Sequence, residues 1–364
     1  MNARVQLKDI ASFSKGEQIN GENLIEDGVY PYLNGGIQPS GRWTACNAPG
    51  NTITISEGGN SCGYVNLMTE PFWCGAHCYY LYDLSVDVQY LYFALKSQQA
   101  RLMGIRTGAC MPNIKKNDLG CFDLTIHTEI AEQKRIVQQL LLCQTVIEQR
   151  QRQLRALDAL IKALFVELFG DPVSNPFGLP TKKLSELGSL DRGRSQHRPR
   201  NDPELLGGPY PLIQTGEVSS AGLYITEYHN TYSEIGLKQS KMWKAGTLCI
   251  TIAANIAQTA IMSFDACFPD SVVGFVPNDE VNALYIHYWF GFFQKILEDQ
   301  APQVAQKNIN LKILSDLNVI VPARKTLEQF EAFVSQINKS KVVVQRALKR
   351  AQVLFDSLMQ GYFG

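Results

Sequence analysis

The stretch LRALDALIKALFVELFGDP (residues 154–172) lies near the middle of a 364-residue chain and decides how the rest is interpreted. Apolar residues recur in it at steps of three and four, at Leu154, Leu157, Ile161, Leu164 and Leu168. This spacing is typical of one face of an amphipathic helix, and Gly170 and Pro172 are the usual signals for a helix end. The stretch therefore predicts a long helix that ends near residue 170, with a new globular part after it.

Length and composition favour a soluble protein with two domains. A chain of 364 residues suits two domains of roughly 130–150 residues with connectors. A hydrophobic content of 45% is that of a globular protein. The opening residues MNARVQLKDIASF lack the apolar core of a signal peptide, and no apolar run has the length of a membrane span. We therefore expect a cytoplasmic protein.

The two halves of the chain repeat one another. LKDIASFSKG from residue 7 matches LSELGSLDRG from residue 184, and YPYLNGG from Tyr30 matches YPLIQTG from Tyr210. Each half continues with a strand-like run (NTITIS or GTLCITIA), an aromatic helical segment, a polar loop and a last strand (CFDLTIH or LNVIVP). Each half then ends in a long helix that begins near Glu-Gln, at residues 132 and 328. A period of about 180–196 residues is too long for a solenoid and indicates a duplicated domain with its helix.

Both long helices carry heptads. In the first helix one seam consists of Leu140, Ile147, Leu154, Ile161 and Leu168. In the second helix one seam consists of Phe330, Ile337, Val344, Ala351 and Leu358. About 40 residues make a rod of roughly 60 Å, longer than a domain of this size is wide, so we expect the helices to pair with each other rather than each on its own domain. A duplicated unit with a pseudo-two-fold axis makes the pairing antiparallel.

The sequence thus predicts an α+β fold of two tandem mixed domains with two long helices that form an intramolecular antiparallel coiled coil. The predicted boundaries are 1–127 for the first recognition domain, 128–170 for the central helix, 171–322 for the second recognition domain and 323–364 for the C-terminal helix.

Sequence motifs for catalysis are missing. The chain has no phosphate-binding Gly-x-x-x-x-Gly-Lys loop, no Gly-x-Gly-x-x-Gly turn, no Gly-x-Ser-x-Gly elbow and no His-Glu-x-x-His helix. The nine cysteines form no Cys-x-x-Cys pair. Cys74, His77 and Cys78 are close in sequence and leave a zinc site, or an enzyme built around it, as an alternative. The main hypothesis is a binding protein without metal or cofactor of its own.

Charge is zero overall but unevenly distributed. It is −2 over residues 1–128, +1 over 129–170, −3 over 171–322 and +4 over 323–364. One basic loop, DRGRSQHRPR, stands out, with Arg192, Arg194, Gln196, His197, Arg198 and Arg200. Arginine in an exposed loop suits contact with DNA phosphates and bidentate binding of guanine. We predict that this loop binds DNA.

Polar loops of both halves add further candidates for contact with bases, because Asn and Gln pair bidentately with adenine. In the first half they are Lys15, Gln18, Asn34, Gln38, Arg42, Trp43, Arg106, Thr107 and Lys115. In the second half they are Gln214, Thr215, Gln303, Gln306 and Lys307.

Three segments resemble the DNA specificity subunit of type I restriction–modification systems. They are LDALIKALFVELFGDP at the end of the central helix, RGRSQHRPRNDPELLGGPYPLIQTGEV in the second half, and QKNINLKILSDLNVIVP before LEQ. The resemblance covers essentially the whole chain. The end of the second helix (LFDSLMQGYFG) and the loop GACMPNIKKNDL of the first half depart from the family pattern.

The resemblance implies a non-catalytic subunit that reads a bipartite, asymmetric DNA site, one half-site per domain. Its implied partners are double-stranded DNA, two adenine-N6 methyltransferase subunits that bring S-adenosylmethionine, and ATP-dependent restriction subunits. The alternative is a repressor-like protein that binds a DNA sequence by itself. Tight binding of DNA by the purified chain at physiological salt would favour that alternative.

Overall fold

The computed structural model describes residues 2–108, 111–253, 256–300 and 309–364. The chain divides into two compact units, one of Met1–Arg152 with Val344–Gly364 and one of Gln153–Val343. Each unit takes a part of both long helices. This division therefore does not test the domain boundaries predicted from the sequence, which stay predictions.

The first unit contains three small sheets. A four-stranded antiparallel sheet has the order β2 (Ser12–Lys15), β8 (Cys78–Tyr82), β5 (Thr52–Ser56) and β6 (Val65–Met68). A three-stranded sheet has the order β4 (Gly41–Trp43), β3 (Tyr30–Leu33) and β7 (Trp73–Cys74), and β1 (Asn2–Gln6) pairs with β9 (Asp123–His127). The helical elements are α1 (Leu7–Ile10), η1 (Gly21–Asn23), α2 (Val88–Ser97), α3 (Gln99–Gly104) and α4 (Lys116–Gly120).

The second unit repeats this plan with additions. Its larger sheet has the order β11 (Gly188–Arg192), β19 (Val272–Pro277), β16 (Leu248–Thr251), β17 (Thr259–Met262) and β13 (Tyr224–Ile225). A four-stranded sheet has the order β14 (Asn230–Tyr232), β12 (Leu206–Leu212), β18 (Ala266–Cys267) and β15 (Met242–Trp243), and β10 (Thr181–Lys183) pairs with β20 (Asn318–Ile320). The helical elements are η2 (Leu184–Glu186), η3 (Pro203–Leu205), α6 (Thr215–Ser220), α7 (Glu234–Lys238), α8 (Ala283–Gln300) and α9 (Leu311–Ser315).

Matching strand orders establish the duplication that the sequence predicts, because β2-β8-β5-β6 corresponds to β11-β19-β16-β17. Two glycines occupy corresponding positions in the two halves. The amide of Gly16 donates to the carbonyl of Cys78 (3.3 Å), and that of Gly193 donates to the carbonyl of Val272 (2.9 Å). A Cβ atom at either glycine would lie within 2.3 Å of a backbone carbonyl oxygen, so no larger residue fits there.

The aromatic helical segments form as predicted, with one difference in the first half. There the helix is divided in two, α2 and α3, at Gln98, whose φ of −96° and ψ of 17° leave the helical region. Asp87 caps α2 by accepting a hydrogen bond from the amide of Tyr90 (3.0 Å). The second counterpart, α8, runs unbroken from Ala283 to Gln300.

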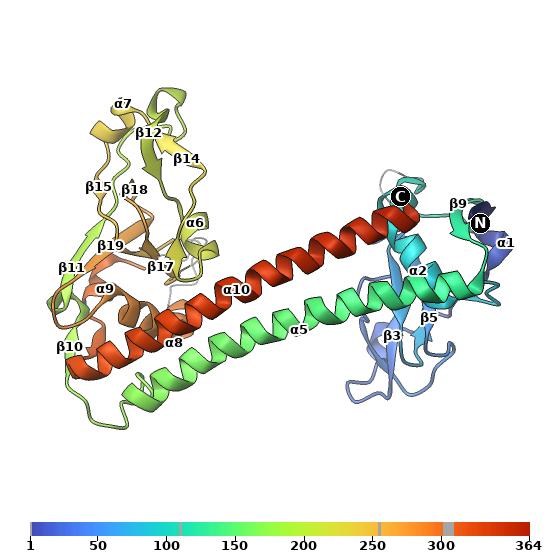
Figure 1. Cartoon of the computed structure of the whole chain (residues 1–364), viewed down its shortest axis with the longest axis horizontal. Coiled ribbons are helices and arrows are strands. Elements are labelled where there is room, and N and C mark those ends of the chain that lie inside the picture. The colour runs from blue at the N-terminus through green and yellow to red at the C-terminus, as the bar shows by residue number, and fades with distance from the viewer. Residues whose placement is uncertain (1, 109–110, 254–255, 301–308) are drawn as a thin grey trace. The chain divides into compact units, whose positions relative to one another are not determined.

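In the first unit, the beginning of α5 (Ile130–Phe169) lies antiparallel to the end of α10 (Arg324–Phe363) (Figure 1). Ile136 and Leu140 of α5 are fully buried in one core with Phe363 of α10. The Tyr362 hydroxyl donates to Oε1 of Gln139 (2.5 Å). Of the predicted seam, Leu140, Ile147 and Val344 are buried in this unit, whereas Ala351 and Leu358 of α10 are partly exposed.

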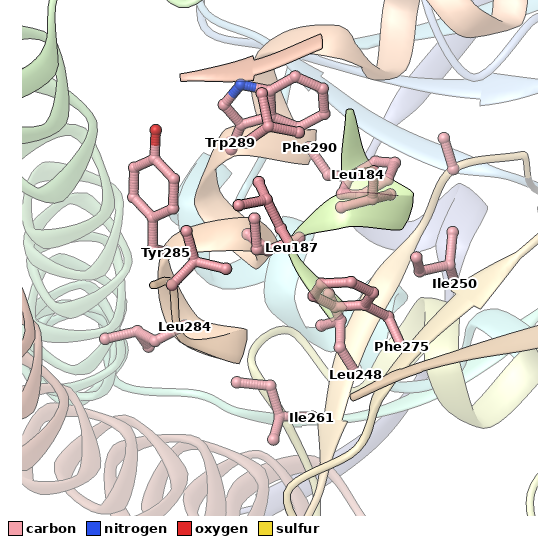
Figure 2. Close-up of a cluster of buried hydrophobic side chains, with 14 of the residues drawn as sticks. Leu184, Leu187, Leu248, Ile250, Ile261, Phe275, Leu284, Tyr285, Trp289 and Phe290 are labelled. Atoms are coloured by element: carbon pink, nitrogen blue, oxygen red, sulfur yellow. The ribbon is translucent and has the colours of Figure 1, made fainter. Parts of the chain in front are cut away.

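In the second unit, the end of α5 lies antiparallel to the beginning of α10. Ile161, Phe165 and Phe169 of α5 share one core with Phe330, Val334 and Ile337 of α10. The same core continues into the side chains that Figure 2 shows, where Leu184 and Leu187 meet Tyr285, Trp289 and Phe290 of α8. Lys341, which stands seven residues after Val334 and thus on the same face of α10, pairs with Asp158 of α5 (2.6 Å).

The predicted α+β class, with two tandem mixed domains and two long antiparallel helices, is confirmed. Among the described residues, no helix combines the length and the apolar composition that crossing a bilayer requires.

Candidate nucleic-acid interface

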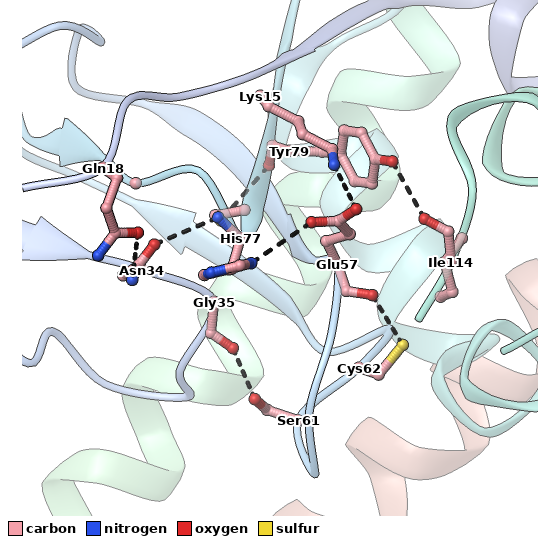
Figure 3. A network of polar contacts seen from close by, with 12 residues as sticks. Lys15, Gln18, Asn34, Gly35, Glu57, Ser61, Cys62, His77, Tyr79 and Ile114 are labelled. Carbon is pink, nitrogen blue, oxygen red and sulfur yellow. Dashed lines mark hydrogen bonds and ion pairs between the residues drawn. The ribbon is translucent and has the colours of Figure 1, made fainter. Parts of the chain in front are cut away.

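A buried carboxylate organises the polar residues of the first unit. Glu57, which directly follows β5, is 8% exposed, and its carboxylate pairs with the ammonium group of Lys15 at the end of β2. Its other oxygen lies 3.7 Å from Nδ1 of His77 (Figure 3). The predicted contact residue Lys15 is therefore neutralised inside its own unit, while the His77 ring is 63% exposed beside it.

Two further predicted residues join this cluster. The side-chain amide of Asn34, after β3, donates to Oε1 of Gln18 (3.1 Å). Oδ1 of Asn34 accepts from the amide of His77 (3.2 Å), and the Glu57 amide donates to the carbonyl of His77 (2.9 Å). Three segments distant in sequence thus place Lys15, Gln18 and Asn34 around His77 (Figure 3).

The loop before α4 reaches the same cluster through its backbone. The amide of Ile114 donates to the carbonyl of Glu57 (2.8 Å), and the Tyr79 hydroxyl donates to the carbonyl of Ile114 (3.0 Å). Burial, with the nearby Glu57 carboxylate, raises the pKa of Tyr79 to about 12, so this hydroxyl stays a donor. Of the predicted residues here, Arg106, Thr107 and Lys115 are exposed, and Thr107 pairs with Asn113 through backbone hydrogen bonds.

The remaining predicted residues of the first unit lie on the β3–β4 hairpin. Gln38 is exposed in its turn. The guanidinium of Arg42 donates to the carbonyls of Gly28 and Val29, and the Trp43 ring lies against Trp73 with centroids 6.5 Å apart. Arg42 thus ties β4 to the residues that precede β3, and Trp43 packs on β7 of the same sheet.

In the second unit, Asp270 gathers the arginines of the basic loop. Its carboxylate is 2.7 Å from the Arg200 guanidinium and 3.9 Å from that of Arg198, and its backbone carbonyl accepts from Nε of Arg192 (3.0 Å). Arg194 is exposed, and no contact of its guanidinium is found among the described residues. Arg194 is therefore the loop arginine whose charge is least compensated.

The loop backbone is held by Gln239. Its Oε1 accepts from the amides of Gln196 (2.6 Å) and His197 (3.1 Å), and the neighbouring Ser240 hydroxyl donates to the carbonyl of Arg194 (3.0 Å). The His197 ring lies 3.2 Å from Asp202. The hydrogen bond from the Glu204 amide, with the one from His197, lowers the pKa of the Asp202 carboxyl. The basic loop is thus an ordered surface.

Gln214 and Thr215, predicted from the second half, line a cavity of about 380 Å³ with Arg200. Gln214 follows β12 where Asn34 follows β3, in agreement with the predicted repeat. The last three predicted residues, Gln303, Gln306 and Lys307, lie outside the described residues.

Sequence reasoning missed the acidic residues and amides that support these loops. Glu57, Asp270 and Gln239 give no sequence motif, because the residues that their side chains contact lie 20 or more positions away in the chain. The sequence suggests His77 only as a zinc ligand, as part of an enzyme site or as a structural residue, and not as a neighbour of the polar loops. The signal that would have found it is the match of its position with Ser271 in the repeat.

The zinc alternative rested on Cys74, His77 and Cys78. The thiol of Cys74 is buried and donates to the carbonyl of Cys78 (3.4 Å), and the thiol of Cys78 donates to that of Tyr79 (3.6 Å). The neighbouring Cys78 thiol and burial raise the pKa of Cys74. Among the described residues, no group of three or more His, Cys, Asp or Glu is arranged to hold a metal ion.

Chemically, the two clusters offer amides, hydroxyls and guanidinium groups. Such groups form hydrogen bonds with base edges and phosphates, which is the chemistry of sequence readout.

The sequence of the chain matches a known protein family. The family model described as type I restriction modification DNA specificity domain matches residues 2–154 and 178–343. A protein of Mycoplasma pneumoniae, named as a type I specificity subunit, is 37% identical over 137 residues; the match covers 37% of this chain and 36% of that relative.

Two solved structures share the fold. The type I restriction–modification S subunit of M. genitalium aligns with 100% of this chain and 96% of its own, at a TM-score of 0.69 and 20% identity. A chain from a structure concerned with complex assembly and conformational transition of the type I system aligns with 99% of this chain and 96% of its own, at a TM-score of 0.58 and 13% identity.

Proposed function

Since the chain belongs to the type I restriction–modification DNA specificity family, we propose that it is the non-catalytic subunit that selects the DNA site of such a complex. The observation that carries the proposal is the duplication. The family model matches both halves, and each half contains its own cluster of polar side chains on the same strand framework. Two similar domains with different side chains suit a bipartite, asymmetric site, with one half-site per domain.

The partners follow as part of the proposal. The chain recruits two adenine-N6 methyltransferase subunits, which bind S-adenosylmethionine, and restriction subunits, which hydrolyse ATP; the chain itself carries no cofactor. Its place is the cytoplasm, where the DNA is.

The long helices offer a surface for a partner subunit. Within the first unit, Val353 and Leu354 of α10 are 60% and 53% exposed, and a hollow of about 540 Å³ lies beside them between Arg346, Lys349, Arg350 and Ser357. A contiguous exposed apolar patch beside a hollow is typical of an interaction site. We assign this surface to a methyltransferase subunit, and a Val353→Asp, Leu354→Asp variant should lose copurification with it.

The decisive experiment maps methylated adenines in cells that express the chain with its methyltransferase partner. We expect one motif with two half-sites and an unread spacer. Exchanging residues 1–127 for the same part of a related subunit should change one half-site only, and exchanging residues 171–322 should change only the other. A motif that changes in both halves after either exchange would contradict one half-site per domain. Tight DNA binding by the chain alone at physiological salt would favour the repressor-like alternative.

A further inference from the structure

The repeat brings corresponding positions of the two units to the same place in the fold. Counting from the Gly16–Cys78 and Gly193–Val272 hydrogen bonds, Gln18 corresponds to Ser195 and His77 to Ser271. The backbone supports this register, because the Glu57 amide donates to the carbonyl of His77 (2.9 Å) as that of Ile252 does to Ser271 (3.0 Å). Asn34 and Gln214 correspond as the second residues after Tyr32 and Leu212, which pair in the same way with Gly41 of β4 and Asn230 of β14.

The side chains at these corresponding positions hydrogen-bond to protein groups in the first unit but, among the described residues, not in the second. In the first unit, Gln18 and Asn34 hydrogen-bond each other, and Asn34 also binds the His77 backbone. In the second unit, the corresponding Ser195, Gln214 and Ser271 line the 380 Å³ cavity instead. Their side chains make no hydrogen bond with the described residues, and the same holds for three further lining residues: Asn201, Thr215 and Asn230.

The charge of the cavity is already balanced. Among the described residues that line it, the cation is Arg200, which pairs with Asp270 at 2.7 Å. A phosphate or carboxylate entering the cavity would have to compete with Asp270 for this guanidinium. A neutral ligand leaves the ion pair intact.

The rest of the lining is apolar. Leu212 and Tyr232 are 4% and 2% exposed, and Leu206 and Pro269 complete the wall. A cavity of this size, with one apolar wall and several convergent polar side chains, suits a small planar molecule that hydrogen-bonds through its edge.

We propose that this cavity of the second unit is a nucleobase-binding pocket with a preference for adenine. The proposal rests on the proposed function for its ligand class, since nucleobases are the neutral planar groups that a DNA-reading domain meets. Carboxamides pair bidentately with adenine, whereas guanine is read by arginine, and the arginine here is occupied by Asp270. Gln214, Asn201 and Asn230 are the amides available to contact the base edge.

The base has two possible sources. A base of the bound DNA reaches a cavity by leaving the stack, as it does in enzymes that extrude a base. A free nucleoside reaches the same cavity from solution. The chemistry of binding is the same, and two measurements separate the sources.

The first measurement is binding of adenosine and guanosine to the full purified chain, followed by calorimetry and by NMR of the nucleoside. We expect saturable binding of adenosine and weaker binding of guanosine. Gln214→Leu and Asn230→Leu should each weaken adenosine binding by about tenfold, the usual order for a lost bidentate contact. Gln149→Leu, a change of an exposed amide on α5, is the matched control and should leave binding unchanged.

The second measurement uses the chain assembled with its methyltransferase partner, on DNA that carries the mapped motif. 2-Aminopurine, an adenine analogue whose fluorescence rises when it leaves the stack, replaces in turn each adenine of the second half-site except the methylated one, which the methyltransferase itself extrudes. A rise at one position that Asn230→Leu abolishes identifies DNA as the source. Adenosine binding without such a rise identifies the free nucleoside.

The pocket is refuted if neither adenosine binding nor a 2-aminopurine signal is found while the complex still methylates its motif. That result would leave the proposed function intact. Failure of the assembled complex to methylate any bipartite motif, with adenosine binding present, would instead contradict the proposed function and retain the pocket.

Discussion

The ion pairs of Asp270 lead to a prediction about how DNA binding depends on salt concentration. Its carboxylate neutralises Arg200 at 2.7 Å and lies 3.9 Å from Arg198. Asp270→Asn removes that negative charge and keeps the size of the side chain. The loop backbone should keep its conformation, because Gln239 and Ser240 hold it through hydrogen bonds that do not involve Asp270.

The magnitude follows from the number of arginines released. Each additional phosphate contact steepens the slope of log K against log salt by about 0.9. If only Arg200 is released, the affinity of the complex for target DNA should fall between 50 and 200 mM salt by about 3.5-fold more than that of the wild type. Release of Arg198 as well would make this additional factor about 12.

The assay is fluorescence anisotropy of labelled target DNA with the chain and its methyltransferase partner, at several KCl concentrations. Asp279→Asn is the matched control, since Asp279 is exposed and no ion pair of its side chain is found among the described residues. It changes the net charge by the same amount away from the loop. Equal slopes for the two variants would refute the reasoning, because Asp270 would then not restrain arginines that reach DNA.

Three further predictions concern stability and geometry. Phe165→Ala should lower the free energy of unfolding of the second unit by about 3–5 kcal/mol in urea denaturation, whereas Val166→Ala on the exposed side should cost less than about 1 kcal/mol; similar costs would mean that the end of α5 is not part of that core. Burial lowers the pKa of His287 to about 4, so the free energy of unfolding should fall by up to about 3 kcal/mol as the pH drops from 6.5 towards 4. His287→Gln should flatten this part of the plot of unfolding free energy against pH, and an unchanged plot would show that His287 is not the group responsible. Inserting four residues near Gln149–Arg152 adds about 6 Å of helix and about 40° of rotation, so methylated-motif mapping should find intact half-sites with a spacer longer by one or two base pairs; the original spacing in an active variant would show that the helix does not set it.

The fold was predictable where a pattern repeats along the chain. Heptads, strand-like runs and helix-end signals occur within short windows, and the second half presents them again, so a weak signal in one half was supported by the other. The contacts of Phe165 and Phe169 were not predictable in this way. They lie outside the chosen seam, and they are buried because α8, more than 100 residues later, packs its Tyr285 ring against both.

The candidate site was predictable as residue types in loops, but not as pairings. The basic loop was found because four arginines stand close together in sequence. That three of them contact Asp270 depends on the register of β11 against β19, in which Arg192 lies opposite Val273. For the same reason Arg42 was predicted to contact DNA, although its guanidinium binds the carbonyls of its own hairpin. Whether these residues contact DNA stays a prediction.

The two units show how one framework carries two different polar surfaces. Gly16 and Gly193 are tightly packed against backbone carbonyls, and the strands beside them keep the same register, so these positions tolerate little change. The residues that follow the strands are under no such restriction. Asn34 pairs with Gln18 in one unit, whereas Gln214 faces a cavity in the other, although the strands that the two units share have the same order. Because the side chains that make the difference contribute little to either core, substitutions there should alter recognition at small cost in stability. The proposed exchange of half-sites relies on this separation of framework from polar surface.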